Sequence, residues 1–276
     1  MKTINTLKKV SLATFLTFVL SFSSVFAQND TMYIMKSGAI AGQYNVNTEV
    51  DSVIFYKPTI EETTSETFID SRDGNEYNWV QIGDQVWMAE NLAYLPSVNM
   101  VADGSEDAAG SYYYVCGYDG TNVADAKATD NYATYGVLYN WTAAMDGEAS
   151  STTNPSGIQG VCPAGWHLPS DAEWTELTDY LGGTSVAGGK LKETGTTHWA
   201  SPNTGATNET GFTALPGGNR DFDGTFDLVG SYGIWWSATE ASATSAWYRY
   251  MGDFDSNVYR DIDGKEVGVS VRCVRD

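Results

Sequence analysis

The chain has 276 residues, of which 35 are Asp or Glu and 15 are Lys or Arg, so its formal net charge is −20 at pH 7. A surface with this charge repels the phosphate backbone of nucleic acids, and we therefore expect no nucleic-acid partner. The length suits one large domain, or one domain with a short appendage.

Residues 1–27 have the pattern of a secretory signal peptide. Lys2, Lys8 and Lys9 precede an apolar stretch at 10–25, and the sequence VFA at 25–27 fits a cleavage site. The apolar stretch is shorter than the roughly 20 residues of a membrane-spanning helix. We expect cleavage after Ala27, a secreted or surface-exposed protein, and no transmembrane segment in the mature chain.

Residues 28–57 are predicted to form a short β segment. The apolar runs at 32–35 and 53–56 read as strands, and Ser37-Gly38 is a turn signal. Residues 58–67 are polar, rich in Thr and Glu and without apolar periodicity, which indicates a linker. The main domain is expected to span residues 68–276, and all nine tryptophans lie within it.

The first part of the main domain alternates as in a β-meander. Strands are expected at 68–71, 76–82 and 85–91, separated by the turn signals Asp73-Gly74 and Gly83-Asp84. Residues 97–131 are predicted to be surface loop around one strand at 112–115. A short helix is expected at 135–145, and residues 146–160 are expected to be loop.

The sequence VCPAGWHLPSDAEWTELTDYLGG, at 161–183, contains the clearest helix signal. Ser170 and Glu173 form a capping box, in which each side chain accepts a hydrogen bond from the backbone amide of the other residue. Trp174, Leu177 and Leu181 share one face, so a helix is predicted over 170–181, with a second short one at 186–193. His167 is interpreted as a packed residue at the entrance of the helix rather than a metal ligand.

The rest of the chain consists of short segments separated by glycines. The final segment alternates Val267, Val269, Val271 and Cys273 against Ser270, Arg272 and Val274. Many short antiparallel strands, one or two helices and long loops predict the α+β class. The later strands are expected at 211–219, 233–240, 246–252, 256–262 and 267–276.

The three cysteines are Cys116, Cys162 and Cys273. Outside the cytoplasm one pair should form a disulfide and one thiol should be left over. The residues alone leave all three pairings open.

One acidic segment is a candidate calcium site. In DFDGTFD, Asp221, Asp223 and Asp227 surround Gly224 and imitate the first half of an EF-hand loop. The twelfth position is Tyr232 instead of Glu, so the segment is not an EF-hand. Turns closed by Asp side chains explain the same pattern without a metal.

Aromatic residues near the end of the chain are the candidate ligand-binding residues. Exposed Trp and Tyr side chains stack on sugars and anchor protein interfaces, whereas packing inside the protein is the alternative explanation. The candidates are Trp235, Trp236, Trp247, Tyr248, Tyr250, Phe254 and Tyr259.

From about Phe68 to Asp276 the chain resembles the Fibrobacter succinogenes major paralogous domain. The resemblance implies a bacterial secreted or surface protein and implies no particular activity. It rests on the blocks DGNEYNWVQIGDQVWMAENL, YGVLYNW, CPAGWHLPSDAEW, GGKLKETGTTHW, TNETGFTALPGG, WWSATE, AWYR and VSVRCVRD.

The layout is also similar to the C-type-lectin-like fold that formylglycine-generating enzymes share. This resemblance implies a disulfide between Cys162 and Cys273. It also implies what a formylglycine-generating activity would require, which is a pair of cysteines near the terminal strand that bind copper. Here Cys273 is the one cysteine in that region, which argues against the activity.

We therefore expect a non-catalytic binding or adhesion module that recognises a glycan or a protein through aromatic loop residues. No cofactor other than Ca²⁺ is considered. The alternatives are an enzyme related to formylglycine-generating enzymes or to glycan modification, and a structural component of the cell surface.

Overall fold

The computed structural model describes residues 31–36, 39–45 and 67–276, and the chain divides into two units, 1–62 and 63–276. In the first unit β1 (Thr31–Lys36) and β2 (Ala39–Asn45) pair antiparallel, with Thr31 opposite Asn45. β1 includes the strand predicted at 32–35. The predicted signal peptide, the run at 53–56 and all but the last residue of the predicted linker lie outside the described residues.

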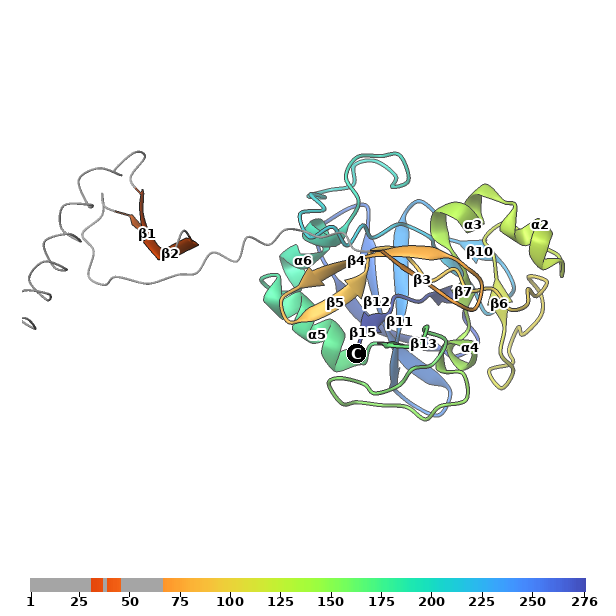
Figure 1. Ribbon diagram of the computed structural model, residues 1–276. Coiled ribbons are helices and arrows are strands. Elements are labelled where there is room, and N and C mark those ends of the chain that lie inside the picture. Colours follow the sequence, from red (N-terminus) through yellow and green to blue (C-terminus); the bar gives the residue numbers. More distant parts are fainter. Residues whose placement is uncertain (1–30, 37–38, 46–66) are drawn as a thin grey trace, which may run out of the picture. The chain divides into compact units, whose positions relative to one another are not determined.

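The second unit contains two main sheets and one small hairpin (Figure 1). Within it β11 and β14 pair in parallel, and the other named strand pairs are antiparallel. The six-stranded sheet has the order β13 (Tyr259–Gly264), β12 (Ser245–Gly252), β11 (Tyr232–Glu240), β14 (Val269–Ser270), β7 (Leu138–Tyr139), β6 (Tyr113–Tyr114). The five-stranded sheet has the order β3 (Thr67–Ile69), β4 (Glu76–Ile82), β5 (Gln85–Met88), β15 (Val274–Arg275), β8 (Trp166–His167), and the hairpin pairs β9 (Asn219–Arg220) with β10 (Phe226–Asp227).

The predicted capping-box helix is confirmed. α5 (Asp171–Tyr180) begins after Ser170, whose hydroxyl accepts from the amide of Glu173 while the Glu173 carboxylate accepts from the amide of Ser170. The next helix, α6 (Thr184–Leu191), begins two residues before the predicted start. Few helices among many antiparallel strands confirm the α+β class.

Some elements differ from the predictions. The segment 97–131 was expected to be loop, but α2 (Val123–Lys127) lies within it and α3 (Asp130–Tyr135) begins in it. Both helices are too short to show an apolar period, and their start signals are the capping side chains of Asn122 and Thr129. The pair lies on the opposite side of the unit from α5 and α6 (Figure 1).

Two further predictions are partly wrong. Within the short helix expected at 135–145, Tyr135 ends α3, Leu138 and Tyr139 form β7, and α4 covers only Trp141–Met145. The strand expected at 211–219 is irregular until β9 begins at Asn219, because Gly211, Thr213 and Gly218 have φ of +71°, +53° and +64°, which an extended strand does not use.

The last ten residues run between two hydrophobic cores of the second unit. Their position explains why successive side chains alternate in the sequence. Val269, Val271 and Cys273 pack into the first core, and Val274 packs into the second. Ser270 and Arg272 are also buried, so neither side of the segment faces solvent between Val267 and Val274. The segment contributes β14 to one sheet and β15 to the other, and it thereby connects the two sheets.

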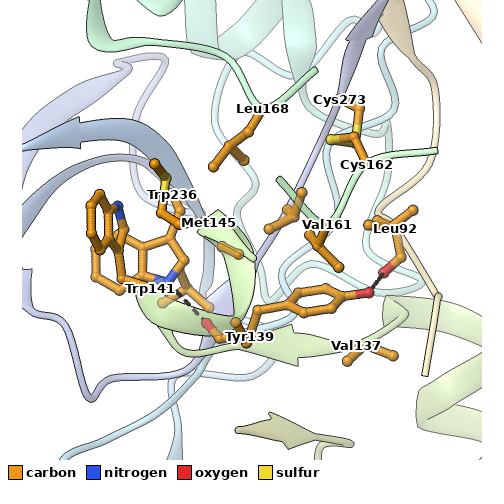
Figure 2. Close-up of a cluster of buried hydrophobic side chains, with 14 of the residues drawn as sticks. Leu92, Val137, Tyr139, Trp141, Met145, Val161, Cys162, Leu168, Trp236 and Cys273 are labelled. Atoms are coloured by element: carbon orange, nitrogen blue, oxygen red, sulfur yellow. Dashed lines mark hydrogen bonds between the residues drawn. A yellow bond between two sulfur atoms is a disulfide. The ribbon is translucent and has the colours of Figure 1, made fainter. Parts of the chain in front are cut away.

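The first core surrounds the disulfide between Cys162 and Cys273 (Figure 2). The pairing is the one that the lectin-like resemblance implied. Below the bridge lies the ring of Tyr139, whose backbone carbonyl accepts from the indole N–H of Trp236 at 2.9 Å. The remaining cysteine, Cys116, is buried with Tyr114 and Leu138 in a small separate cluster.

The second core is built from aromatic rings. Trp87, Trp174, Phe212 and Trp235 are fully buried, with ring centroids 4.6–6.3 Å apart. The guanidinium of Arg272 lies 4.1 Å from the Phe212 ring centroid, and backbone and side-chain oxygens accept its hydrogen bonds. Across the described part of the chain, no helix has the length and apolar character needed to span a bilayer.

Candidate functional site

A buried histidine occupies the centre of the motif at 161–183. His167 Nε2 lies 2.6 Å from Glu173 Oε1, and His167 Nδ1 lies 2.8 Å from Asp276 Oδ1. The second oxygen of Glu173 accepts from the amides of Ser156 and Ser170, each at 2.9 Å. These groups bind one another and the backbone, so they stabilise the start of α5 rather than form an open site.

The charge of His167 follows from its two partners. Burial alone lowers the pKa of an imidazole, but the hydrogen bonds and charges of Glu173 and Asp276 outweigh burial and raise the pKa of His167 above its usual 6.5. The sequence analysis identified Glu173 as a capping residue and missed its contact with His167. The capping box itself gives no sign of this second role.

This arrangement predicts a pH dependence of stability. A raised folded pKa means that the stabilisation is fully present below the unfolded pKa of about 6.5 and is lost as the pH rises through the folded pKa. In urea titrations between about pH 5.5 and 9, the difference in unfolding free energy between wild type and His167→Gln should therefore shrink as the pH rises. A difference that stays constant or grows would contradict the ion-pair assignment.

The candidate calcium residues do not converge. Asp221 Oδ1 accepts from the amide of Phe222, Asp223 Oδ1 accepts from the amide and hydroxyl of Thr225, and Asp227 Oδ1 accepts from the amide of Leu228. Among residues 67–276, no group of three or more His, Cys, Asp or Glu side chains is arranged to hold a metal ion. The geometry of the described residues gives the calcium hypothesis no support, and local turns explain the segment.

Two of the candidate aromatic residues are inside the protein. Trp235 lies in the second core and Trp236 in the first, and both have no exposed surface. Neighbouring residues of a strand point to opposite sides, and β11 has a core on each side. We therefore remove both tryptophans from the set of ligand-binding candidates.

Trp247 is on the side of β12 that faces α5. The guanidinium of Arg260 lies 3.3 Å from its ring centroid, and Arg260 also binds Asp171 at 2.9 Å. Asp171 accepts a second charged hydrogen bond, at 2.6 Å, from the buried Arg249. One face of the Trp247 ring is therefore occupied by a structural ion-pair network, on the other side of the strand from the remaining aromatic candidates.

The remaining candidates form one continuous aromatic surface, which we call the tyrosine face. It consists of the candidates Tyr248, Tyr250, Phe254 and Tyr259, together with Tyr232, which was not a candidate. Tyr250 contacts three neighbours, with ring centroids 4.7 Å away for Tyr259 and 5.8 Å away for both Tyr232 and Tyr248. Phe254 lies 5.8 Å from Tyr232 and 6.2 Å from Tyr259, and it is 46 % exposed.

The strand register produces the tyrosine face. Tyr250 pairs with Tyr259 on β13 and with Ile234 on β11, so Tyr250, Tyr259 and Tyr248 project from the same side of the sheet. Tyr232, Tyr248 and Tyr250 pack against the edge of the first core and are half-buried. The face is therefore the place where the first core reaches the surface.

Hydrogen bonds from a buried lysine hold the loop between β12 and β13 in place. Lys192 is fully buried, and its ammonium donates to the carbonyls of Thr204, Gly252 and Asp255 at 2.6–3.1 Å. Burial lowers the pKa of Lys192 to about 8. Above the loop the hydroxyl of Tyr259 donates to Asp255 Oδ2 at 2.5 Å. These bonds hold the loop that carries Phe254.

Hydroxyl groups and carboxylates border the rings. Within residues 67–276 the hydroxyls of Tyr248 and Tyr250 have no hydrogen-bond partner. Burial, Asp263 and Asp261 raise the pKa of Tyr248, and burial and Asp261 raise that of Tyr250. The hydroxyls are therefore neutral and can both donate to and accept from a ligand.

The sequence analysis missed Tyr232, which belongs to the tyrosine face. It lies three residues before the adjacent tryptophans, outside the strand expected at 233–240. Its place follows from pairing with Gly252, the last residue of β12, which brings Tyr232 beside Phe254. Only the cross-strand register could have identified it.

A separate open recess of about 500 Å³ lies beside α5. Its acidic residues are Asp84, Glu176 and Asp179, and its lining includes no His, Cys, Lys or Arg. A formylglycine-type site would need a pair of thiols, but Cys162 and Cys273 are joined to each other and Cys116 is buried. We assign no reaction to this recess or to the cysteines.

Comparison with known proteins gives one match. Residues 80–275 match the family model of the Fibrobacter succinogenes major domain. No curated protein and no solved structure matches the chain.

Proposed function

The chain belongs to the Fibrobacter succinogenes major domain family, and we propose that it is a non-catalytic binding or adhesion module whose ligand docks on the tyrosine face. The observation that carries the proposal is the gathering of five aromatic rings from β11, β12, β13 and the loop before β13 on one side of the sheet. Rings at the surface with free hydroxyls offer both apolar area and hydrogen bonds.

The way the rings are held supports binding. Tyrosine has two side-chain torsions, so it contributes a large contact area at a low cost in conformational entropy. All four tyrosines project from strands, and the loop of Phe254 is anchored by Lys192. A ligand would therefore meet a surface that is already ordered, which favours affinity.

We also propose that the protein is located outside the cytoplasm. The disulfide is compatible with an oxidising compartment, where such bonds persist. The proposal also includes the C-type-lectin-like arrangement, supported by a helix that opens with SDAEW and a bridge from Cys162 to the terminal segment.

Substitution of two tyrosines tests the proposal. Wild type, the double variant Tyr250→Ala/Tyr259→Ala and the single variant Tyr180→Ala are applied to a glycan array and to a peptide library. Losing two partly buried tyrosines from an interface should weaken binding at least tenfold, because such anchors each contribute about 1–2 kcal/mol.

Tyr180 is the matched control, since it is 63 % exposed and lies on α5, away from the tyrosine face. The Tyr180→Ala variant should bind as wild type does. Binding to neither set, or binding that the double variant retains while its melting temperature is unchanged, would refute the proposal. If the purified protein bound neither set and instead assembled into ordered polymers, the alternative of a structural cell-surface component would be favoured.

A further inference from the structure

The carboxylates beside the tyrosine face indicate the class of its ligand. Resting on the proposed function, we propose that the ligand is a basic segment of a protein, whose Lys or Arg side chains bind Asp261 and Asp263 while its other atoms contact the tyrosine face. Three observations support it: the register of β13, the lack of an ion pair to either carboxylate within residues 67–276, and the way the rings pack.

Register places the two carboxylates next to the rings. On β13, Tyr259, Asp261 and Asp263 point to one side, and their partners on β12 are Tyr250, Tyr248 and Ala246. Residues two apart on a strand are separated by about 6.6 Å. A ring pair and two carboxylates therefore follow one another along a single strand, at a spacing that alternate side chains of an extended peptide can match.

Asp261 and Asp263 form no ion pair with a basic side chain of residues 67–276, and neither does the neighbouring Asp221. Burial, followed by the charges of Asp221, Glu266 and Asp261, raises the pKa of Asp263. Carboxylates that repel one another in this way are stabilised when a cation binds between them.

The hydrogen bonds of β13 favour docking on the face over addition of a strand. β13 is at the edge of its sheet, and its outward amides at Ile262 and Gly264 already donate to Asp261 Oδ1 and Asp263 Oδ1. Edge amides that are occupied in this way do not pair readily with another strand. The second oxygen of each carboxylate has no partner within residues 67–276 and is free to accept from a ligand.

The packing of the rings favours a protein over a glycan. Tyr250 and Tyr259 stack with an angle of 11° between their planes, and Tyr232 and Tyr248 flank Tyr250. Neighbouring rings therefore cover much of the flat surface of Tyr250 on which a sugar would stack, and ring edges and hydroxyls remain for the ligand. Tyrosines mixed with Asp, Asn and Ser resemble the composition of protein-binding antibody loops.

A labelled peptide in which arginine and serine alternate is the probe. In fluorescence-anisotropy titrations it should bind the wild type, and binding should weaken as salt rises from about 50 to 500 mM. The variant Asp261→Asn/Asp263→Asn should bind about five- to tenfold more weakly, since each lost charge removes one exposed ion pair. Asparagine keeps the oxygen that accepts from the next amide.

The control variant is Asp84→Asn/Asp179→Asn, which changes the net charge equally at two exposed residues beside α5. It should bind the arginine peptide as wild type does. Equal weakening by both variants, or equal binding of a peptide with glutamine in place of arginine, would refute the inference. If a glycan binds through Tyr250 and Tyr259 while the arginine peptide does not, the inference fails and the proposed function stands. If no probe depends on the tyrosine face, both fail.

Discussion

Replacing Cys162 and Cys273 together with alanine is expected to lower the free energy of unfolding by about 2–5 kcal/mol. The bridge joins residues 111 positions apart, so its loss gives the unfolded chain a large gain in conformational freedom. It also connects the loop before β8 to the segment between β14 and β15, inside the first core. Urea denaturation of the variant and the wild type measures the effect.

Cys116→Ala is the control for this experiment. Cys116 is buried but unbridged, and its loss removes one small side chain from a cluster with Tyr114 and Leu138. We expect a cost of about 1 kcal/mol, which corresponds to a small cavity. If the double alanine variant were no less stable than Cys116→Ala, the bridge would have no part in holding the terminal segment between the two sheets.

Replacing Glu173 with alanine is expected to cost about 3–5 kcal/mol, the range observed when one partner of a buried charged pair is removed. The side chain is 2 % exposed and accepts from His167 and from the amides of Ser156 and Ser170. Its removal leaves two buried amides and a buried imidazole without their acceptor. Urea denaturation near neutral pH measures the cost.

Ser170→Ala separates this role from capping alone. It removes the hydrogen bond from the Glu173 amide to the Ser170 hydroxyl. The free energy of unfolding should fall by about 1 kcal/mol. The contacts of Glu173 with His167 and Ser156 remain in that variant. Equal losses for Ser170→Ala and Glu173→Ala would show that Glu173 acts as a capping residue and no more.

Local signals in the sequence predicted the elements that depend on neighbouring residues. α5 follows from its capping box and from the spacing of Trp174, Leu177 and Leu181, and β4 and β5 follow from alternation around Gly83-Asp84. α2 and α3 were missed because helices of five and six residues are too short for a periodic pattern. The disulfide came from the family resemblance, since three cysteines alone permit three pairings.

The candidate site depended on contacts between distant strands, which the sequence does not encode locally. Alternation along a strand implies that Trp235 and Trp236 point to opposite sides, but it gives no sign that both sides of β11 are covered. The tyrosine face arises from the register of three strands, and this register separates Tyr250 from Trp247 and brings in Tyr232. Four of the seven candidates therefore share one surface, together with a residue that was not predicted.

The most direct test of the tyrosine face as a binding surface is the amide chemical-shift map of the isotopically labelled protein with the arginine-serine peptide added. We expect the largest shifts at residues 231–233, 248–251 and 253–263, which carry the rings and the two carboxylates. Shifts that cluster beside α5 around Tyr180, or that are absent at a peptide excess that saturates binding, would contradict this expectation.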